Sequence, residues 1–185
     1  FAAALAAQTP TGLKGLMYVG TFDRKLMIIS EDKGDVVGEI PLGGIARTTV
    51  LSADKTKLHL VTTQMQVETV DLAARKVISS FPLSDGRSSP RMTRGAGGRT
   101  FSGMVVDPSD RYLYMTLSLV IQELDHFRAD PPQFVMVDLQ DKKIVKSLPF
   151  PKGYDQGFGF GASFKISPDG KLLASASWDH NVKIW

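Results

Sequence analysis

Four arginines cluster in a glycine-rich stretch of this 185-residue sequence, and their chemistry suits an anion. A guanidinium presents a planar fork of donors to a carboxylate or phosphate, and glycines let backbone N–H groups approach the same anion. The four, within residues 84–101, are Arg87, Arg91, Arg94 and Arg99; Arg47 stands at the equivalent junction of the preceding repeat. We expect a small anionic ligand or an acidic partner here. A solvated loop kept soluble by its charge is the alternative.

Residues 151–161 mix aromatic side chains with glycines. Tyr154, Phe158 and Phe160 offer ring faces that could stack on a ligand or a protein partner. The same rings could instead fill the central channel of the fold inferred below. Both interpretations stay open at the level of sequence.

Residues 118–133 space Val120, Leu124 and Phe127 as the apolar face of a helix does. The spacing predicts one or two helical turns, ending before Pro131, that form a short amphipathic lid. Asp125 and His126 are neighbours in this stretch, and an Asp–His pair can exchange protons. Adjacent residues of a helix diverge, so we expect no hydrogen bond between these two.

Other chemistry finds little support in the sequence. There is no cysteine, which excludes disulfides and thiolate catalysis. The three histidines, His59, His126 and His180, lie far apart and show no metal-ligand spacing. The net charge is only +3, and the arginine-rich stretch lacks interleaved aromatics. We therefore expect no metal, no cofactor and no nucleic-acid partner.

The elements that must position these stretches come from a repeat. A turn followed by a strand-like run begins at Ser52, Asp107 and Ser167, so the starts lie 55 and 60 residues apart. A four-stranded antiparallel blade with its turns takes about 40–50 residues. The repeat predicts an all-β fold, a β-propeller whose blades each have four strands, named A (innermost) to D (outermost).

The repeat also predicts the boundaries. Blades are expected at residues 16–45, 46–100, 101–161 and 162–185; the first lacks strand A and the last stops after strand C. These three and a half blades suggest a fragment of a six- to eight-bladed propeller, whose remaining blades would be its partners. All long connections run from D to A or from B to C, on one face. That face, called the long-loop face, is where we expect binding.

The first fifteen residues look like a signal-peptide remnant and linker. Ala4-Leu5-Ala6 fits the small-x-small pattern of a cleavage site, with a mature start at Ala7. This predicts an exported protein, periplasmic or secreted and bacterial. A plain alanine-rich leader is the alternative. No apolar run approaches the ~20 residues that span a bilayer.

Several motifs resemble the YVTN family of bacterial propellers, which are relatives of the β-propeller subunits of quinoprotein amine dehydrogenases. The similarity covers residues 16–177 and rests on Met17-Tyr-Val-Gly-Thr, Ile40-Pro-Leu-Gly-Gly, Val137-Asp-Leu and Ser167-Pro-Asp-Gly-Lys-Leu-Leu. The resemblance implies an exported propeller. It also implies two alternative functions: a subunit of a periplasmic amine-dehydrogenase-like redox enzyme, or a propeller lactonase or lyase.

The last nineteen residues instead resemble a WD40 repeat, a family that locks each blade with a tetrad of His, Ser/Thr, Asp and Trp. Ser177, Asp179 and Trp185 match three tetrad positions, whereas Gly153-Tyr-Asp-Gln-Gly replaces the usual Gly-His pair. These residues would lock the blade rather than do chemistry. The resemblance implies a WD40-type protein-interaction scaffold as a further alternative.

Taken together, the patterns favour a non-catalytic, exported β-propeller. It would bind a protein partner or a small anionic ligand through its long-loop face.

Overall fold

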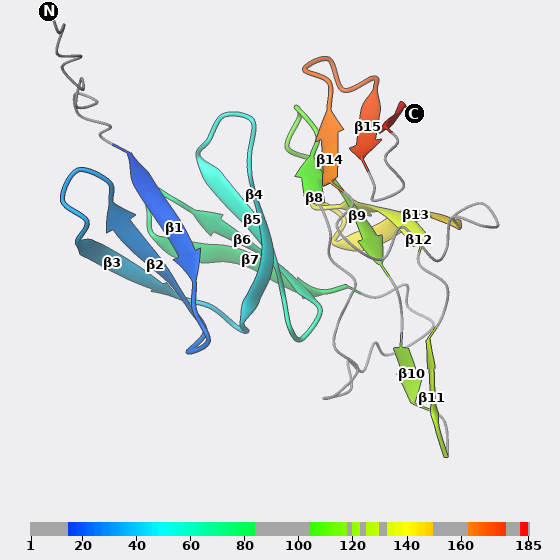
Figure 1. Ribbon diagram of the computed structural model, residues 1–185, viewed down its shortest axis with the longest axis horizontal. Coiled ribbons are helices and arrows are strands. Elements are labelled where there is room, and N and C mark those ends of the chain that lie inside the picture. Colours follow the sequence, from blue (N-terminus) through cyan, green and yellow to red (C-terminus); the bar gives the residue numbers. More distant parts are fainter. Residues whose placement is uncertain are drawn as a thin grey trace, which may run out of the picture.

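The computed structural model describes residues 15–83, 104–117, 120–122, 125–129, 133–149, 163–176 and 182–184. In these ranges the chain forms sixteen strands joined by turns, with no helix. Figure 1 shows the sheets following one another along the chain, from β1–β3 at one end to β14–β16 at the other. The described residues thus form an all-β partial β-propeller, and this part of the prediction is confirmed.

Two blades have all four strands. Blade two has the order β4-β5-β6-β7, and blade three the order β8-β9-β12-β13, each pair antiparallel. The bounds in blade two are β4 (Ala46–Leu51), β5 (Lys57–Thr62), β6 (Gln66–Asp71) and β7 (Lys76–Pro82). Those in blade three are β8 (Met104–Val106), β9 (Tyr112–Leu117), β12 (Gln133–Asp138) and β13 (Lys143–Pro149).

The two terminal blades show three strands each among the described residues. Blade one consists of β1 (Leu16–Gly20), β2 (Lys25–Ser30) and β3 (Val36–Pro41). Blade four consists of β14 (Ser163–Ile166), β15 (Leu173–Ala176) and β16 (Val182–Ile184).

The helical lid expected within residues 118–133 is wrong. Two short strands, β10 (Val120–Gln122) and β11 (Phe127–Ala129), pair as an antiparallel hairpin instead. Three apolar residues are too few to fix a helical period, and β-branched and aromatic residue types favour extended chain. Figure 1 shows this hairpin projecting away from blade three, between β9 and β12.

Side-chain alternation along each strand packs the blades against one another. Leu58 and Leu60 of β5 face blade one, whereas Val61 faces blade three. The largest cluster joins blades two and three, and a smaller one around Phe164 joins blades three and four. Burying each such aliphatic side chain contributes about 1.5–3 kcal/mol, so the contacts between blades hold the arc together.

Candidate functional site

The A-to-B turns of blades two, three and four share one hydrogen-bond pattern. In blade two the backbone N–H of Lys57 donates to Ser52 Oγ at 3.0 Å. In blade four Leu172 donates to Ser167 Oγ at 3.0 Å. In blade three an aspartate takes the place of the serine, and Tyr112 donates to its carboxylate at 2.6 Å. The repeat read from the sequence is therefore a repeat of turn geometry.

Each turn also pairs a hydroxyl with a carboxylate. Ser52 Oγ donates to Asp54 at 2.6 Å, and Ser167 Oγ donates to Asp169 at 2.5 Å. Blade three swaps the two residue types, so that Ser109 donates to Asp107. The hydrogen bond from Ser52 is the main reason that the pKa of Asp54 falls to about 2.

Burial alone would raise the pKa of the Asp107 carboxyl. The hydrogen bonds that it accepts from Ser109, and from the backbone N–H groups of Tyr112 and Arg111, outweigh burial and lower that pKa. The hydroxyl of Ser167 likewise lowers the pKa of Asp169. The turn carboxylates are thus tuned to stay ionised and to hold the turns.

The fourth residue of each turn adopts a left-handed backbone conformation. It is Lys55 with φ 58°, Asp110 with φ 59° and Gly170 with φ 73°. Asp, Asn and Gly visit this region more readily than other residues do. In blade three this position aims a carboxylate out of the turn toward blade two.

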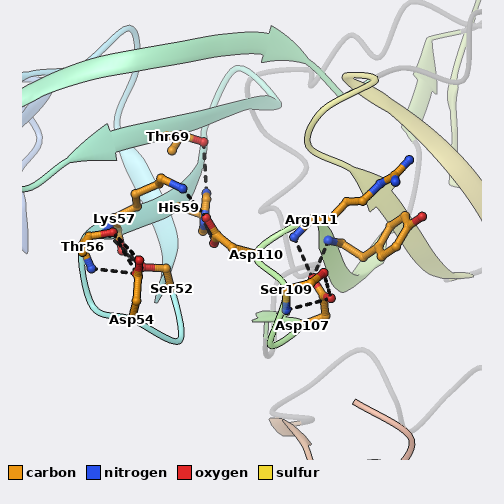
Figure 2. A network of polar contacts seen from close by, with 11 residues as sticks. Ser52, Asp54, Thr56, Lys57, His59, Thr69, Asp107, Ser109, Asp110 and Arg111 are labelled. Carbon is orange, nitrogen blue, oxygen red and sulfur yellow. Dashed lines mark hydrogen bonds and ion pairs between the residues drawn. The ribbon is translucent and has the colours of Figure 1, made fainter. Parts of the chain in front are cut away.

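Asp110 links the two complete blades (Figure 2). Its Oδ1 lies 2.6 Å from His59 Nε2, and its Oδ2 lies 2.6 Å from Lys57 Nζ, so one carboxylate of blade three serves two side chains of β5. His59 Nδ1 lies 3.0 Å from Thr69 Oγ1 of β6. The hydrogen bond that the Lys57 ammonium donates to Asp110 raises the pKa of Lys57.

This chain of groups borders an open pocket of about 420 Å³ between blades two and three, which we call the polar recess. Its lining includes Ser79, whose hydroxyl has no hydrogen-bond partner among the described residues. Carboxylate, imidazole and hydroxyl follow one another as in hydroxyl-nucleophile enzymes. Thr69 is only 6% exposed, however, so its hydroxyl is better placed to orient the imidazole of His59 (2% exposed) than to attack a substrate.

Two buried carboxylates serve the backbone. Glu68, 1% exposed, accepts the Gly43 N–H at 2.9 Å, and burial raises the pKa of this carboxyl. Asp138 accepts two hydrogen bonds of 3.0 Å from the Arg111 guanidinium and one of 2.9 Å from the Asp141 N–H. The bond from the Asp141 backbone, with help from Arg111, lowers the pKa of Asp138.

Of the residues predicted to bind a ligand or partner, the structure describes Arg47. Its side chain is exposed on β4, where the β4–β5 register shifts between Ala46 and Thr48. The other predicted site residues lie outside the described ranges: Arg87, Arg91, Arg94, Arg99, Tyr154, Phe158, Phe160, Ser177, Asp179 and Trp185. Residues 1–14 of the predicted leader and linker lie outside them too. Those expectations stay predictions.

The expectation for Asp125 and His126 is wrong together with the helix. The two residues lie at the tip of the β10–β11 hairpin, where His126 Nδ1 is 2.6 Å from Asp125 Oδ1. Their side chains are 59% (His126) and 86% (Asp125) exposed. A bend can turn adjacent side chains toward each other, which a helix cannot.

The link between His59 and Asp110 was missed at the level of sequence. One signal was a histidine inside the apolar run Leu58–Val61, and another was an aspartate at the turn position that Gly170 fills in blade four. Their meeting depends on which face of β5 turns toward blade three. That information comes from packing rather than from either motif.

The described residues hold neither a candidate metal site nor a helix that could span a membrane. No group of three or more histidine, aspartate or glutamate side chains is arranged to hold a metal ion there. Within the same residues, no helix has the length and apolar character needed to cross a membrane.

Comparison with known proteins bears on the fold. The family model described as "WD domain, G-beta repeat" matches residues 162–185, which correspond to blade four. The comparison with curated proteins found no match. Among solved structures, Kuenenia stuttgartiensis hydrazine synthase is similar with a TM-score of 0.54 and 15% identity, over 88% of this chain and 40% of that one.

At this identity the likeness to hydrazine synthase shows the fold alone. The chain spans 40% of that protein's length, so the likeness carries no activity to this chain. The solved structure supports the β-propeller fold. The family model supports a WD-type repeat in blade four. The finer resemblance to the YVTN family and to amine dehydrogenase subunits stays a prediction.

Proposed function

We propose that this chain is part of a non-catalytic β-propeller scaffold that binds an acidic protein partner or a small anionic ligand through its long-loop face. The observation that carries the proposal is the β10–β11 hairpin. It gives the longest described B-to-C connection a paired backbone, and it projects from blade three with a polar, exposed tip (Figure 1). Protruding elements on a rigid scaffold are common binding sites.

The arginines that follow β7 favour an anionic partner. β7 and β9 run in the same direction through their blades, so the segment that follows β7 leaves on the same face as the hairpin. That segment holds Arg87, Arg91, Arg94 and Arg99. Four guanidinium groups in one segment suit a carboxylate-bearing surface.

A scaffold role also agrees with how the described carboxylates are used. Asp54, Asp107 and Asp169 hold turns, and Glu68 and Asp138 hold backbone N–H groups. These groups build the blades. The WD-repeat match of blade four adds support, because repeats of that family generally mediate protein interactions.

Export is the further part of the proposal and is supported by the leader-like sequence of residues 1–15. Fractionation of cells that express the gene tests it. Protein in the periplasm or the medium, starting near Ala7, is the expected result. Protein confined to the cytosol would contradict it.

Binding of a fluorescent polyglutamate peptide, followed by anisotropy, tests the binding face. Arg91→Gln/Arg94→Gln should weaken binding by up to about thirtyfold, because each ion pair contributes up to ~1 kcal/mol. The matched control is Lys33→Gln/Lys76→Gln, which removes the same charge at the opposite end of the blades, where both side chains are exposed. Equal losses in both variants would show charge attraction without a defined face.

A further inference from the structure

The apolar counterpart of the polar recess lies between blades three and four. It is an open pocket of about 370 Å³, which we call the apolar recess. It occupies the same place in the repeat. In blade two a cross-strand row runs His59, Thr69, Ser79; in blade three the same row runs Tyr114, Met136, Lys146. Both rows line their recesses.

The turn that closes each recess differs at one position. Asp110 closes the polar recess and places its carboxylate between Lys57 and His59. Gly170 stands at the same turn position in blade four and closes the apolar recess. A carboxylate supplied by the protein in one recess is therefore replaced by a hydrogen atom in the other.

The two recesses also differ in the charged residues of their linings. Lys146 replaces Ser79 in the strand row, and Lys171 follows Gly170 as Arg111 follows Asp110. Arg111 is neutralised by Asp138, whereas neither Lys146 nor Lys171 has an ion pair with a described residue. Both lysines are exposed, and no carboxylate lines this recess.

Aromatic rings form the inner wall. The ring centroids of Tyr114 and Phe134 lie 6.0 Å apart with an interplanar angle of 16°, and Phe164 tilts against Phe134 at 5.5 Å. Met136 and the exposed side chain of Leu148 extend this surface. An apolar body can cover these groups while a charge on it reaches the two lysines.

We propose that the apolar recess binds a small carboxylate carried on an aromatic or aliphatic body. The body packs on Tyr114 and Phe134, and the carboxylate pairs with Lys146 and Lys171, in a recess where Gly170 supplies no carboxylate of its own. The volume of about 370 Å³ falls within the range of small-molecule sites. The site is separate from the long-loop face, because A-to-B turns border it.

The test uses 3-phenylpropanoate as the probe and the full chain, with ligand-observed NMR titrations. The neutral analogue 3-phenylpropan-1-ol has the same body without the charge. Saturable binding of the acid, with binding of the alcohol weaker by about fivefold or more, is expected from the loss of the ion pairs.

Gly170→Asp is the sharpest variant, because it copies the residue of the polar recess. The φ of 73° favours glycine, but Asp110 adopts nearly the same φ at this turn position in blade three, and a Cβ on Gly170 would meet Pro108 Cδ at 3.4 Å, an ordinary contact. The new carboxylate should compete for both lysines and abolish binding of the probe. Gly170→Asn has the same shape without the charge and should retain binding.

Lys146→Gln and Lys171→Gln keep the test informative if Gly170→Asp fails to fold. Each should weaken binding about fivefold. Lys165→Gln, on the exposed side of β14, is the matched control and should leave binding unchanged.

Three results would overturn the proposal. The first is no saturable binding of 3-phenylpropanoate, which would leave the recess to another segment of the chain. The second is equal binding of the acid and the alcohol. The third is equal loss in the folded Gly170→Asp and Gly170→Asn variants.

Discussion

At the scale of single residues, one aspartate makes two polar contacts between neighbouring blades. Asp110 sits on the turn of blade three and reaches two side chains of β5 (Figure 2). A buried imidazole without a partner would carry the full cost of its desolvation. The carboxylate removes that cost for His59, and Thr69 satisfies the other ring nitrogen. We call Asp110, His59 and Lys57 the clamp between blades two and three.

Asp110→Ala should therefore lower the free energy of unfolding by about 1–3 kcal/mol, because His59 loses a charge-assisted hydrogen bond and stays buried. Urea denaturation measures the change. Asp125→Ala, at the exposed hairpin tip, is the control and should stay within about 0.5 kcal/mol of the unsubstituted protein. Equal stability of the two variants would mean that the blades are held by apolar contacts alone.

Glu68 gives a pH dependence of known sign. Burial raises its pKa above 4.5 in the folded protein. A raised pKa means that the folded protein holds the Glu68 proton more tightly than the unfolded chain does. The contribution of this proton to the free energy of unfolding is fully present below pH 4.5 and is lost as the pH rises through the folded-state pKa. The free energy of unfolding of the unsubstituted protein should therefore fall, relative to Glu68→Gln, as the pH rises from 4.5. A parallel pH profile of the two proteins would contradict this.

At the scale of the elements, the A-to-B turns share a pattern of residue types that can be recognised in the sequence. Ser52, Asp107 and Ser167 each start a turn, and the hydroxyl–carboxylate pair inside each turn fixes the backbone. The pairing is local, so residue types two positions apart reveal it. A strand-like run follows each turn, so the turns also locate strands along the chain.

Asp54 carries the acid sensitivity of the blade-two turn. Its pKa is lowered from 3.8 to about 2, first by the hydroxyl of Ser52. Its stabilisation is present above pH 3.8 and is lost as the pH falls toward about 2. The difference in free energy of unfolding between the unsubstituted protein and Asp54→Asn should shrink across that window. A constant difference would show that the ionised carboxylate contributes nothing.

A buried hydroxyl near the end of β9 offers a route to higher stability. Thr116 is buried, and its hydroxyl has no hydrogen-bond partner among the described residues. Thr116→Val keeps the shape and removes a polar group that is buried without compensation. Thermal unfolding should show a gain of roughly 1 kcal/mol. A loss of stability would reveal a partner for this hydroxyl.

At the scale of the whole molecule, the arc of blades is what the sequence predicts best. Blade spacing and strand order follow from the turns that begin at Ser52, Asp107 and Ser167, and the apolar alternation of β5 follows from Leu58 and Leu60. The spacing of three apolar residues alone did not predict the hairpin at residues 120–129, since so few positions do not fix a helical period. The clamp between His59 and Asp110 required knowledge of which faces of neighbouring blades meet.

The blades of this arc are built alike, and their differences lie in what fills the spaces between them and in the connections on the long-loop face. The turn residue is Asp110 beside the polar recess and Gly170 beside the apolar one. The long-loop face carries the β10–β11 hairpin (Figure 1). The scaffold is thus constant, and we propose that recognition lies in its variable parts.

Hydrogen–deuterium exchange with and without a polyglutamate peptide tests the central claim most directly, because it reports which face of the scaffold binds. We expect slower exchange in residues 84–101 and in the hairpin at residues 120–129, with the A-to-B turns at Ser52, Asp107 and Ser167 unchanged. Protection confined to those turns, or no protection at all with the peptide in excess, would contradict binding through the long-loop face.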